Sequence, residues 1–186
     1  YDARAGEFTS GVRWEDEKAL GGRAFFTTAS DPPMLVLEPT HIHDQGIFTC
    51  RVDFRVSPST TALVNLTVVI PAGQPTILWR GHTMLDEVGP LKEDSKPRLI
   101  CRSVGGRPPP DLTWWTGGKP LPILSFKTTS DPLTESYTSE AIVALRATRE
   151  LQGSTLSCQA LTPTDDKAYQ RVVCQPKTSY VVLNVT

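Results

Sequence analysis

Short stretches of alternating apolar and polar residues recur along this chain, and a period of two is the pattern of β-strands with one buried face. No long stretch carries the period of an amphipathic helix, and sixteen prolines and thirteen glycines interrupt the sequence. The pattern therefore predicts an all-β fold. The predicted strands are residues 23–28, 34–37, 47–55, 62–69, 99–101, 112–115 and 156–160.

The strand around Cys50 is the most informative of these, because Asp44 and Gly46 form a tight corner just before it. Its expected inward positions are Phe48, Cys50, Val52 and Phe54. Such a corner and cysteine are typical of the sixth strand of an immunoglobulin sandwich, where the cysteine is the second of the inter-sheet disulfide. Phe48 stands where that strand usually has a tyrosine, and we expect its ring in the core. No cysteine precedes Cys50, so we expect the leading strands of this domain to be missing.

The later part of the chain carries the complete signature of such a sandwich. Cys101 in the second strand and Cys158 in the sixth are expected to form its disulfide. Twelve residues separate Cys101 from Trp114, which suits a turn and a return to the facing sheet. Of the two adjacent tryptophans, Trp114 is expected to pack on the disulfide in preference to Trp115. On the chain-entropy model this crosslink would stabilise the domain by about 4 kcal/mol.

Prolines and a glycine mark the boundary between the two parts, in the run Pro71-Ala72-Gly73-Gln74-Pro75. We therefore predict two immunoglobulin-like β-sandwiches in tandem, of which the first is incomplete. The predicted segments are a partial variable-type domain at 1–70, a linker at 71–74 and a complete constant- or intermediate-type domain at 75–186. Because the linker is short and flanked by prolines, it would restrict the angle between the domains.

The charge balance and two sequons indicate where the protein acts. Nineteen basic and twenty acidic residues leave a formal charge of −1, so the chain has no general basic field for nucleic acid. No apolar run approaches the length of a membrane span. The sequons begin at Asn65 and Asn184, and together with the cysteines they predict N-glycosylation in an oxidising, extracellular setting. We expect a soluble ectodomain cut from a longer protein.

The sequence offers only weak candidates for catalysis or metal binding. His41, His43 and Asp44 are plausible zinc ligands by residue type, but a polar corner loop is the simpler interpretation because no further ligand cluster follows. No Gly-x-Ser-x-Gly motif is present, and His82 is isolated in the sequence. We therefore predict no enzyme, no cofactor and no small-molecule substrate.

Asp44 has a better predicted partner in Arg23, which opens the strand at 23–28. In variable-type immunoglobulin domains an arginine and an aspartate at these places commonly form an ion pair that closes the base of the sandwich. We expect the same structural pair here.

A charged strand face is the candidate binding surface. With Cys50 inward, the outward residues of its strand are expected to be Ile47, Thr49, Arg51, Asp53 and Arg55. A neighbouring strand would extend the patch with Tyr1, Asp2 and Arg4. In variable-type domains this sheet is the usual docking surface, and charges there favour partner choice and association rate. The alternative is a solvated strand face that only keeps the domain soluble.

Two cysteines remain without an assigned partner. Cys50 could bridge to Cys174, but a partner in the absent upstream segment is the better interpretation. Cys174 is then an odd thiol, either free or paired between molecules.

Several segments of the chain resemble the Sidestep proteins of arthropods. The most specific is Cys-Arg-Val-Asp-Phe-Arg followed by Ser-Pro at 50–58, and the segment at 103–114 is similar to the corresponding loop of the second Sidestep domain. The other similar segments are 1–4, 22–26 and 65–68. The resemblance covers nearly the whole chain, apart from the missing leading strands.

The resemblance implies a single-pass membrane protein with several immunoglobulin domains on the extracellular face of the plasma membrane. It further implies a guidance ligand for motor axons that binds ectodomains of the Beaten path type on another cell. It favours docking over a merely solvated face for the charged strand. The alternative function is a generic homophilic or secreted immunoglobulin adhesion module with no guidance role.

Overall fold

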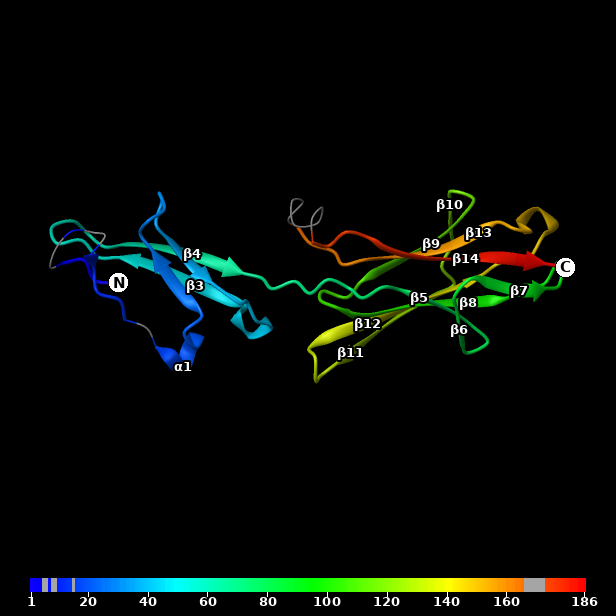
Figure 1. The fold of residues 1–186 in the computed structure, drawn as a ribbon, viewed down its shortest axis with the longest axis horizontal. Helices are drawn as coiled ribbons and strands as arrows, with labels where there is room; N and C mark the ends of the chain where they lie inside the picture. The colour runs from blue at the N-terminus through cyan, green and yellow to red at the C-terminus, as the bar shows by residue number, and fades with distance from the viewer. Residues whose placement is uncertain (5–6, 8–9, 15, 166–172) are drawn as a thin grey trace. The chain divides into compact units, whose positions relative to one another are not determined.

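The computed structural model describes residues 1–4, 7, 10–14, 16–165 and 173–186. The chain divides into two compact units, Tyr1–Val68 (unit 1) and Val69–Thr186 (unit 2). Strands dominate both units (Figure 1), so the predicted all-β fold is confirmed.

Unit 1 is built from two pairs of antiparallel strands. Its elements are α1 (Glu17–Leu20), β1 (Ala24–Thr27), β2 (Met34–Leu37), the 3-10 turn η2 (Ile42–Asp44), β3 (Gly46–Val52) and β4 (Thr60–Leu66). β1 pairs with β2 and β3 pairs with β4. The strand predicted at 34–37 has the observed bounds, whereas the strand predicted at 62–69 begins and ends earlier, as β4.

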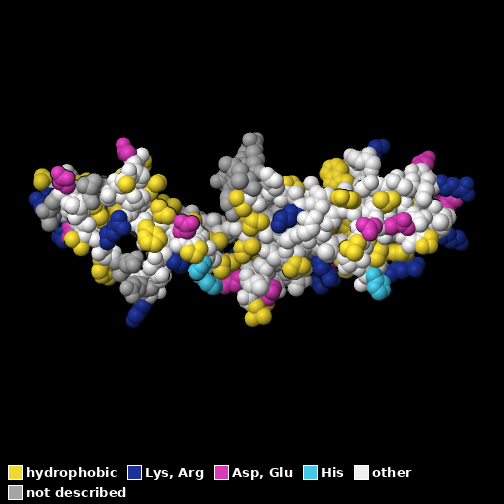
Figure 2. All heavy atoms as spheres, viewed as in Figure 1, with side chains coloured by type: hydrophobic (Ala, Val, Ile, Leu, Met, Phe, Trp, Pro, Cys, Tyr) yellow, Lys and Arg dark blue, Asp and Glu magenta, His cyan; other side chains and the backbone are white. Residues whose placement is uncertain are grey.

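The expected inward face of unit 1 is largely open. Phe48 is half-buried, but the other side chains of its strand that were expected to point inward are exposed. These exposed side chains are Cys50, Val52 and Phe54. Hydrophobic side chains are visible on the surface of unit 1 (Figure 2), and every buried hydrophobic residue in the described part of the chain belongs to unit 2. Unit 1 therefore leaves much of the face that the sequence pattern assigned to a core exposed.

Unit 2 is a sandwich of two five-stranded sheets (Figure 1). Its elements are β5 (Thr76–Trp79), β6 (His82–Met84), β7 (Glu87–Leu91), β8 (Arg98–Gly106), β9 (Asp111–Thr116), β10 (Lys119–Leu121), β11 (Ser125–Asp131), β12 (Ser136–Ala144), the 3-10 turn η3 (Arg149–Leu151), β13 (Thr155–Leu161) and β14 (Lys177–Val185). One sheet has the order β10-β9-β13-β14-β7 and the other β11-β12-β8-β5-β6. The strands predicted at 99–101, 112–115 and 156–160 lie within β8, β9 and β13.

The edges of the first of these sheets both contain proline. β7 pairs in parallel with β14 and contains Pro90, while β10 pairs with β9 and contains Pro120. Proline has no backbone N–H to donate, so edge strands are where a sheet tolerates it. In the other sheet, the edge strand β6 has only three residues.

The predicted disulfide between Cys101 and Cys158 is present and joins β8 of one sheet to β13 of the other. Both cysteines are fully buried. Trp114, also fully buried, lies opposite Cys158 in the β9–β13 register, and its Nε1 donates to the carbonyl oxygen of Ala141 at 3.2 Å. Trp115 is half-buried at the surface. The crosslink and Trp114 therefore occupy one shared core between the sheets.

The segment predicted as a linker differs from that expectation, because the structure includes residues 71–74 in unit 2. The backbone N–H of Ala72 donates to Thr162 Oγ1 at 2.7 Å, and both residues are buried. The N–H of Gly73 donates to the carbonyl of Val104 at 2.8 Å, and Gln74 Nε2 donates to the carbonyl of Thr178 at 2.7 Å. These bonds fix the segment along its length on unit 2.

Candidate functional site

The charged residues of the predicted docking strand lie at the end of a hairpin. β3 ends at Val52, so Asp53 and Arg55 belong to the connection between β3 and β4 and not to the strand face. Asp53 Oδ1 accepts hydrogen bonds from Ser59 Oγ and, at 2.9 Å, from Arg51 Nε. These side-chain bonds join the end of β3 to the residue just before β4.

The electrostatic state of Asp53 follows from the same contacts. The hydroxyl of Ser59 and the guanidinium of Arg51 lower the pKa of its carboxyl below the ordinary value. Asp53 is therefore ionised at neutral pH, and the side chains of the Arg51–Asp53 pair are 63% and 62% exposed. Both charges stand open to solvent.

The N-terminal segment meets the same connection. Arg55 Nη2 donates to the backbone carbonyl of Arg4, and Arg4 Nε donates to both carboxylate oxygens of Asp2, at 2.9 and 3.0 Å. The bonds from the Arg4 side chain and backbone hold the pKa of the Asp2 carboxyl far below its usual range. Asp2 also pairs with Val12 in an isolated β-bridge rather than in a strand beside β3.

Exposed apolar side chains accompany these charges. Val56 is 97% exposed and Phe54 is 54% exposed, both in the β3–β4 connection. The sequence pattern had placed Phe54 in the core, and Val56 was not considered a binding residue. The signal that could have revealed them is the Ser57-Pro58 pair, which is typical of a turn. The hairpin patch, as we call this surface, consists of Asp2, Arg4, Arg51, Asp53, Phe54, Arg55 and Val56.

Three residues expected on the binding surface lie elsewhere on unit 1. The ring centroid of Tyr1 lies 5.1 Å from that of Phe26 on β1, and the Tyr1 hydroxyl accepts a hydrogen bond from the N–H of Gly11 at 2.9 Å. Thr49 is exposed on β3 opposite Leu63 of β4. Ile47 is also exposed on β3, so the structure brings five of the eight residues expected on this surface into the hairpin patch, but not these three.

Arg23 lies just before β1, and its ion-pair partner Asp44 is the last residue of η2. Arg23 Nη1 and Nη2 donate to Asp44 Oδ2 and Oδ1 at 2.6 and 2.7 Å, and the backbone N–H of His41 also donates to Oδ2. The hydrogen bonds from Arg23, which have the larger effect, and the bond from the backbone of His41 hold the pKa of the Asp44 carboxyl well below its ordinary range. Because both carboxylate oxygens are engaged, Asp44 serves the fold. Among the described residues no three His, Cys, Asp or Glu side chains form a metal-binding group.

The other residues singled out from the sequence are spread over both units. Asn65 is exposed on β4, whereas Asn184 on β14 is half-buried and its Nδ2 donates to Glu87 Oε1 at 2.8 Å. Cys50 is exposed, and Cys174 is buried, which raises the pKa of its thiol. Within the described residues, no helix is both long and apolar enough to span a bilayer.

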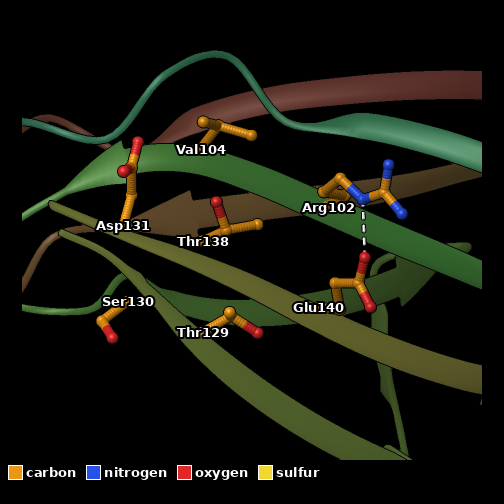
Figure 3. Close-up of a pocket in the computed structure, with 7 residues that line it drawn as sticks. All are labelled: Arg102, Val104, Thr129, Ser130, Asp131, Thr138 and Glu140. Atoms are coloured by element: carbon orange, nitrogen blue, oxygen red, sulfur yellow. Dashed lines mark hydrogen bonds and ion pairs between the residues drawn. The ribbon is translucent and has the colours of Figure 1, made fainter. Parts of the chain in front are cut away.

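A shallow hollow on the outer face of the β8–β12–β11 sheet is a weaker candidate (Figure 3). Its volume is about 360 Å³. Arg102 Nε donates to Glu140 Oε1 at 2.6 Å across the β8–β12 pair, and Asp131 accepts bonds from the N–H of Leu133 and the hydroxyl of Thr134. Because the charged groups lining this hollow have partners within the unit, it offers little to a ligand.

Comparison with known proteins supports the assignment of the fold. A family model for the CD80-like C2-set immunoglobulin domain matches residues 74–175. The irregular chiasm C-roughest protein of Drosophila melanogaster is 26% identical over 155 residues, which are 78% of this chain and 19% of that protein. Cell adhesion molecule 3 of Mus musculus is 26% identical over 163 residues, which are 84% of this chain and 39% of that protein. The chain thus spans about a fifth to two fifths of the length of these curated relatives.

Two solved structures share the fold. The crystal structure of Rst D1-D2 has a TM-score of 0.66 at 24% identity, covering 95% of this chain and 81% of that one. Bovine butyrophilin has a TM-score of 0.64 at 21% identity, covering 87% of this chain and 67% of that one. At these identities the similarity establishes the sandwich architecture alone. Since the family model matches more than half of the sequence, the chain belongs to the CD80-like C2-set immunoglobulin domain family.

Proposed function

We propose that this chain is the recognition region of a cell-surface protein and that it binds a protein ectodomain on another cell through the hairpin patch. The observation that carries the proposal is the gathering of five charged residues and two exposed apolar ones at one hairpin and the segment beside it. Binding rather than catalysis is proposed because the matching relatives are immunoglobulin proteins of the adhesion and receptor type.

The energetics of the patch favour a role in recognition over one in stability. Exposed ion pairs such as Arg51–Asp53 contribute only about 0 to 1 kcal/mol to folding. The same charges at an interface steer association and select among partners. Val56 and Phe54 add apolar area that a partner would bury, and an arginine beside such area is a common binding hot spot.

At the finer level, we propose a heterophilic ligand of the Sidestep type that acts in axon guidance on the extracellular face of the plasma membrane. The resemblance of segment 50–58 supports this level, since that segment includes most of the hairpin patch. The proposed partner is an ectodomain of the Beaten path type. The Cys101–Cys158 disulfide supports an extracellular location, because such bonds persist in oxidising compartments.

The test is binding of the 186-residue chain to a panel of Beaten-path-type ectodomains, measured by biolayer interferometry. Asp53→Arg reverses the charge that Arg51 and Ser59 contact and should abolish binding while leaving the melting temperature unchanged. Asp31→Arg is the matched control, because Asp31 is also exposed and lies in the β1–β2 connection. Unaltered binding by the Asp53 variant would discard the hairpin patch as the docking site.

A second measurement separates the alternative function. Analytical ultracentrifugation of the chain alone, up to about 100 µM, detects self-association at the weak end of specific protein complexes. Self-association that Asp53→Arg abolishes, with no binding to the panel, would support a homophilic adhesion module and contradict the heterophilic proposal.

A further inference from the structure

A second charged surface lies on unit 2, well apart in sequence from the hairpin patch. A hollow of about 520 Å³ is lined by Trp79 at the end of β5, by Arg80 just after it, and by residues from the end of β7 to the start of β8. Four of its lining residues are cations, namely Arg80, Lys92, Lys96 and Arg98. Lys and Arg side chains are visible near the end of unit 2 where β6, β7 and the C-terminus lie (Figure 2). We call this surface the basic hollow.

The basic hollow is not neutralised by the acidic residues next to it in the sequence. Glu93 and Asp94 lie between Lys92 and Lys96, but each binds an arginine elsewhere. Arg149 Nε lies 2.9 Å from Glu93 Oε2, and Arg146 Nη2 lies 2.8 Å from Asp94 Oδ1. None of the ion pairs found among the described residues includes any of the four cations. The fold therefore leaves a local excess of positive charge on a chain whose formal charge is −1.

The backbone that carries these cations is held in place. The N–H of Asp94 donates to the carbonyl of Ala147 at 2.8 Å, and the N–H of Ala147 donates to the carbonyl of Ser95 at 2.9 Å. On the other side, the guanidinium carbon of Arg80 lies 4.4 Å from the ring centroid of Trp79, within range of a cation–π contact. A preorganised cationic surface loses less entropy when a ligand binds.

We infer that the basic hollow binds a sulfated glycosaminoglycan of the cell surface or extracellular matrix. Closely placed like charges without counter-charges destabilise a fold slightly and attract a polyanion. The disulfide in unit 2 indicates an extracellular protein, and sulfated polysaccharides are the abundant polyanions there, whereas nucleic acids are not. The hollow is open and its cations are exposed, which suits a chain of repeated sulfates better than an enclosed small phosphate. This inference does not depend on the hairpin patch.

The experiment compares binding of the full chain and its variants to a heparan sulfate oligosaccharide and to immobilised heparin. The test variant is Lys92→Ala with Lys96→Ala. The control is Lys119→Ala with Lys127→Ala, which removes the same charge from exposed positions on β10 and β11, edge strands opposite β7 and β6 in their sheets. A lysine near an anionic surface strengthens binding about fivefold, so the test variant should bind about 25-fold more weakly than the control variant. The affinity of the parent chain should also fall steeply with salt, as counterion release requires.

Because Lys92 and Lys96 are exposed, their removal should leave the melting temperature unchanged. A single Arg80→Gln variant, which should weaken binding several-fold, provides a second readout if the double variant unfolds. Three results would overturn the inference. These are equal binding by the test and control variants, equal binding of desulfated heparin, and tighter binding to phosphatidylserine vesicles than to heparin, which would assign the hollow to a membrane.

Discussion

Replacing Thr162 with valine tests whether the segment before β5 is an integral part of unit 2. Thr162 is 2% exposed and its Oγ1 accepts the hydrogen bond of the Ala72 N–H at 2.7 Å, while Ala72 itself is 4% exposed. Valine has nearly the same shape but cannot accept that bond. The variant therefore leaves a backbone donor buried without this acceptor.

The expected loss follows from that single donor. Leaving a buried polar group unsatisfied costs roughly 1 to 3 kcal/mol, and we take about 2 kcal/mol. For a unit of this size, about 4 °C of melting temperature corresponds to 1 kcal/mol, so the thermal transition of unit 2 should fall by about 8 °C. If the segment opens more easily as well, the Ala72 amide should exchange with deuterium up to about 30-fold faster.

Differential scanning calorimetry and NMR-detected hydrogen exchange measure the two effects. Thr155→Val is the matched control, since Thr155 is exposed on β13 and the same change there should stay within about 0.5 kcal/mol. A melting temperature within about 2 °C of the parent, together with unchanged Ala72 exchange, would refute the structural role given to residues 71–74.

Three further predictions concern the crosslink, the ion pair of unit 1 and glycosylation. Replacing Cys101 and Cys158 by alanine opens a loop with a sequence separation of 57. The free energy of unfolding should fall by about 4 kcal/mol, which lowers the urea midpoint of unit 2 by about 2 M. A shift below about 0.5 M would contradict this. Since the folded pKa of Asp44 is depressed from 3.8, its contribution to stability is present above that pH and is lost as the pH falls below it. Asp44→Asn should flatten this acid dependence in circular dichroism, and an unchanged profile would oppose it. When the chain is secreted from eukaryotic cells, the Asn65→Gln variant should be lighter than the parent by the mass of one glycan in mass spectrometry, because the Asn65 side chain is exposed. Equal glycan masses would show that Asn65 is not glycosylated.

Three strands of unit 2, β8, β9 and β13, could be predicted from the sequence because several independent signals agree there, whereas the other strands of this unit were not predicted. Cys101, Trp114 and Cys158 occur at spacings that fit one core, and each lies within an alternating apolar stretch. The structure buries all three completely. Agreement between local pattern and long-range crosslink is what makes such a prediction reliable.

The hairpin patch was only partly predictable, because alternation continues past the end of β3. Phe54 keeps the apolar period of Cys50 and Val52, so pattern alone extends the strand. The strand instead ends at Val52 and the chain bends at residues 55–57, while the carboxylate of Asp53 binds Ser59 across the connection. Similarly, Pro71 and Pro75 suggested a linker, whereas the structure bonds this segment to the distant residues Val104, Thr162 and Thr178.

The basic hollow could not be found from the sequence for a different reason. Read in order, Lys92, Glu93, Asp94 and Lys96 look like a balanced, solvated stretch. The balance is lost only after folding, when arginines at positions 146 and 149 bind the two acids. Charge patterning along a sequence reports composition, whereas a binding surface depends on which charges remain after tertiary pairing.

The prolines at the borders of one sheet of unit 2 bear on how neighbouring copies of the chain behave at high concentration. Pro90 in β7 and Pro120 in β10 each remove a main-chain donor from a border where another copy could otherwise add a strand. Uncontrolled polymerisation through backbone pairing is thereby discouraged at both borders of that sheet. Contacts that this sheet makes with other proteins must then rely on side chains, which can be specific and reversible.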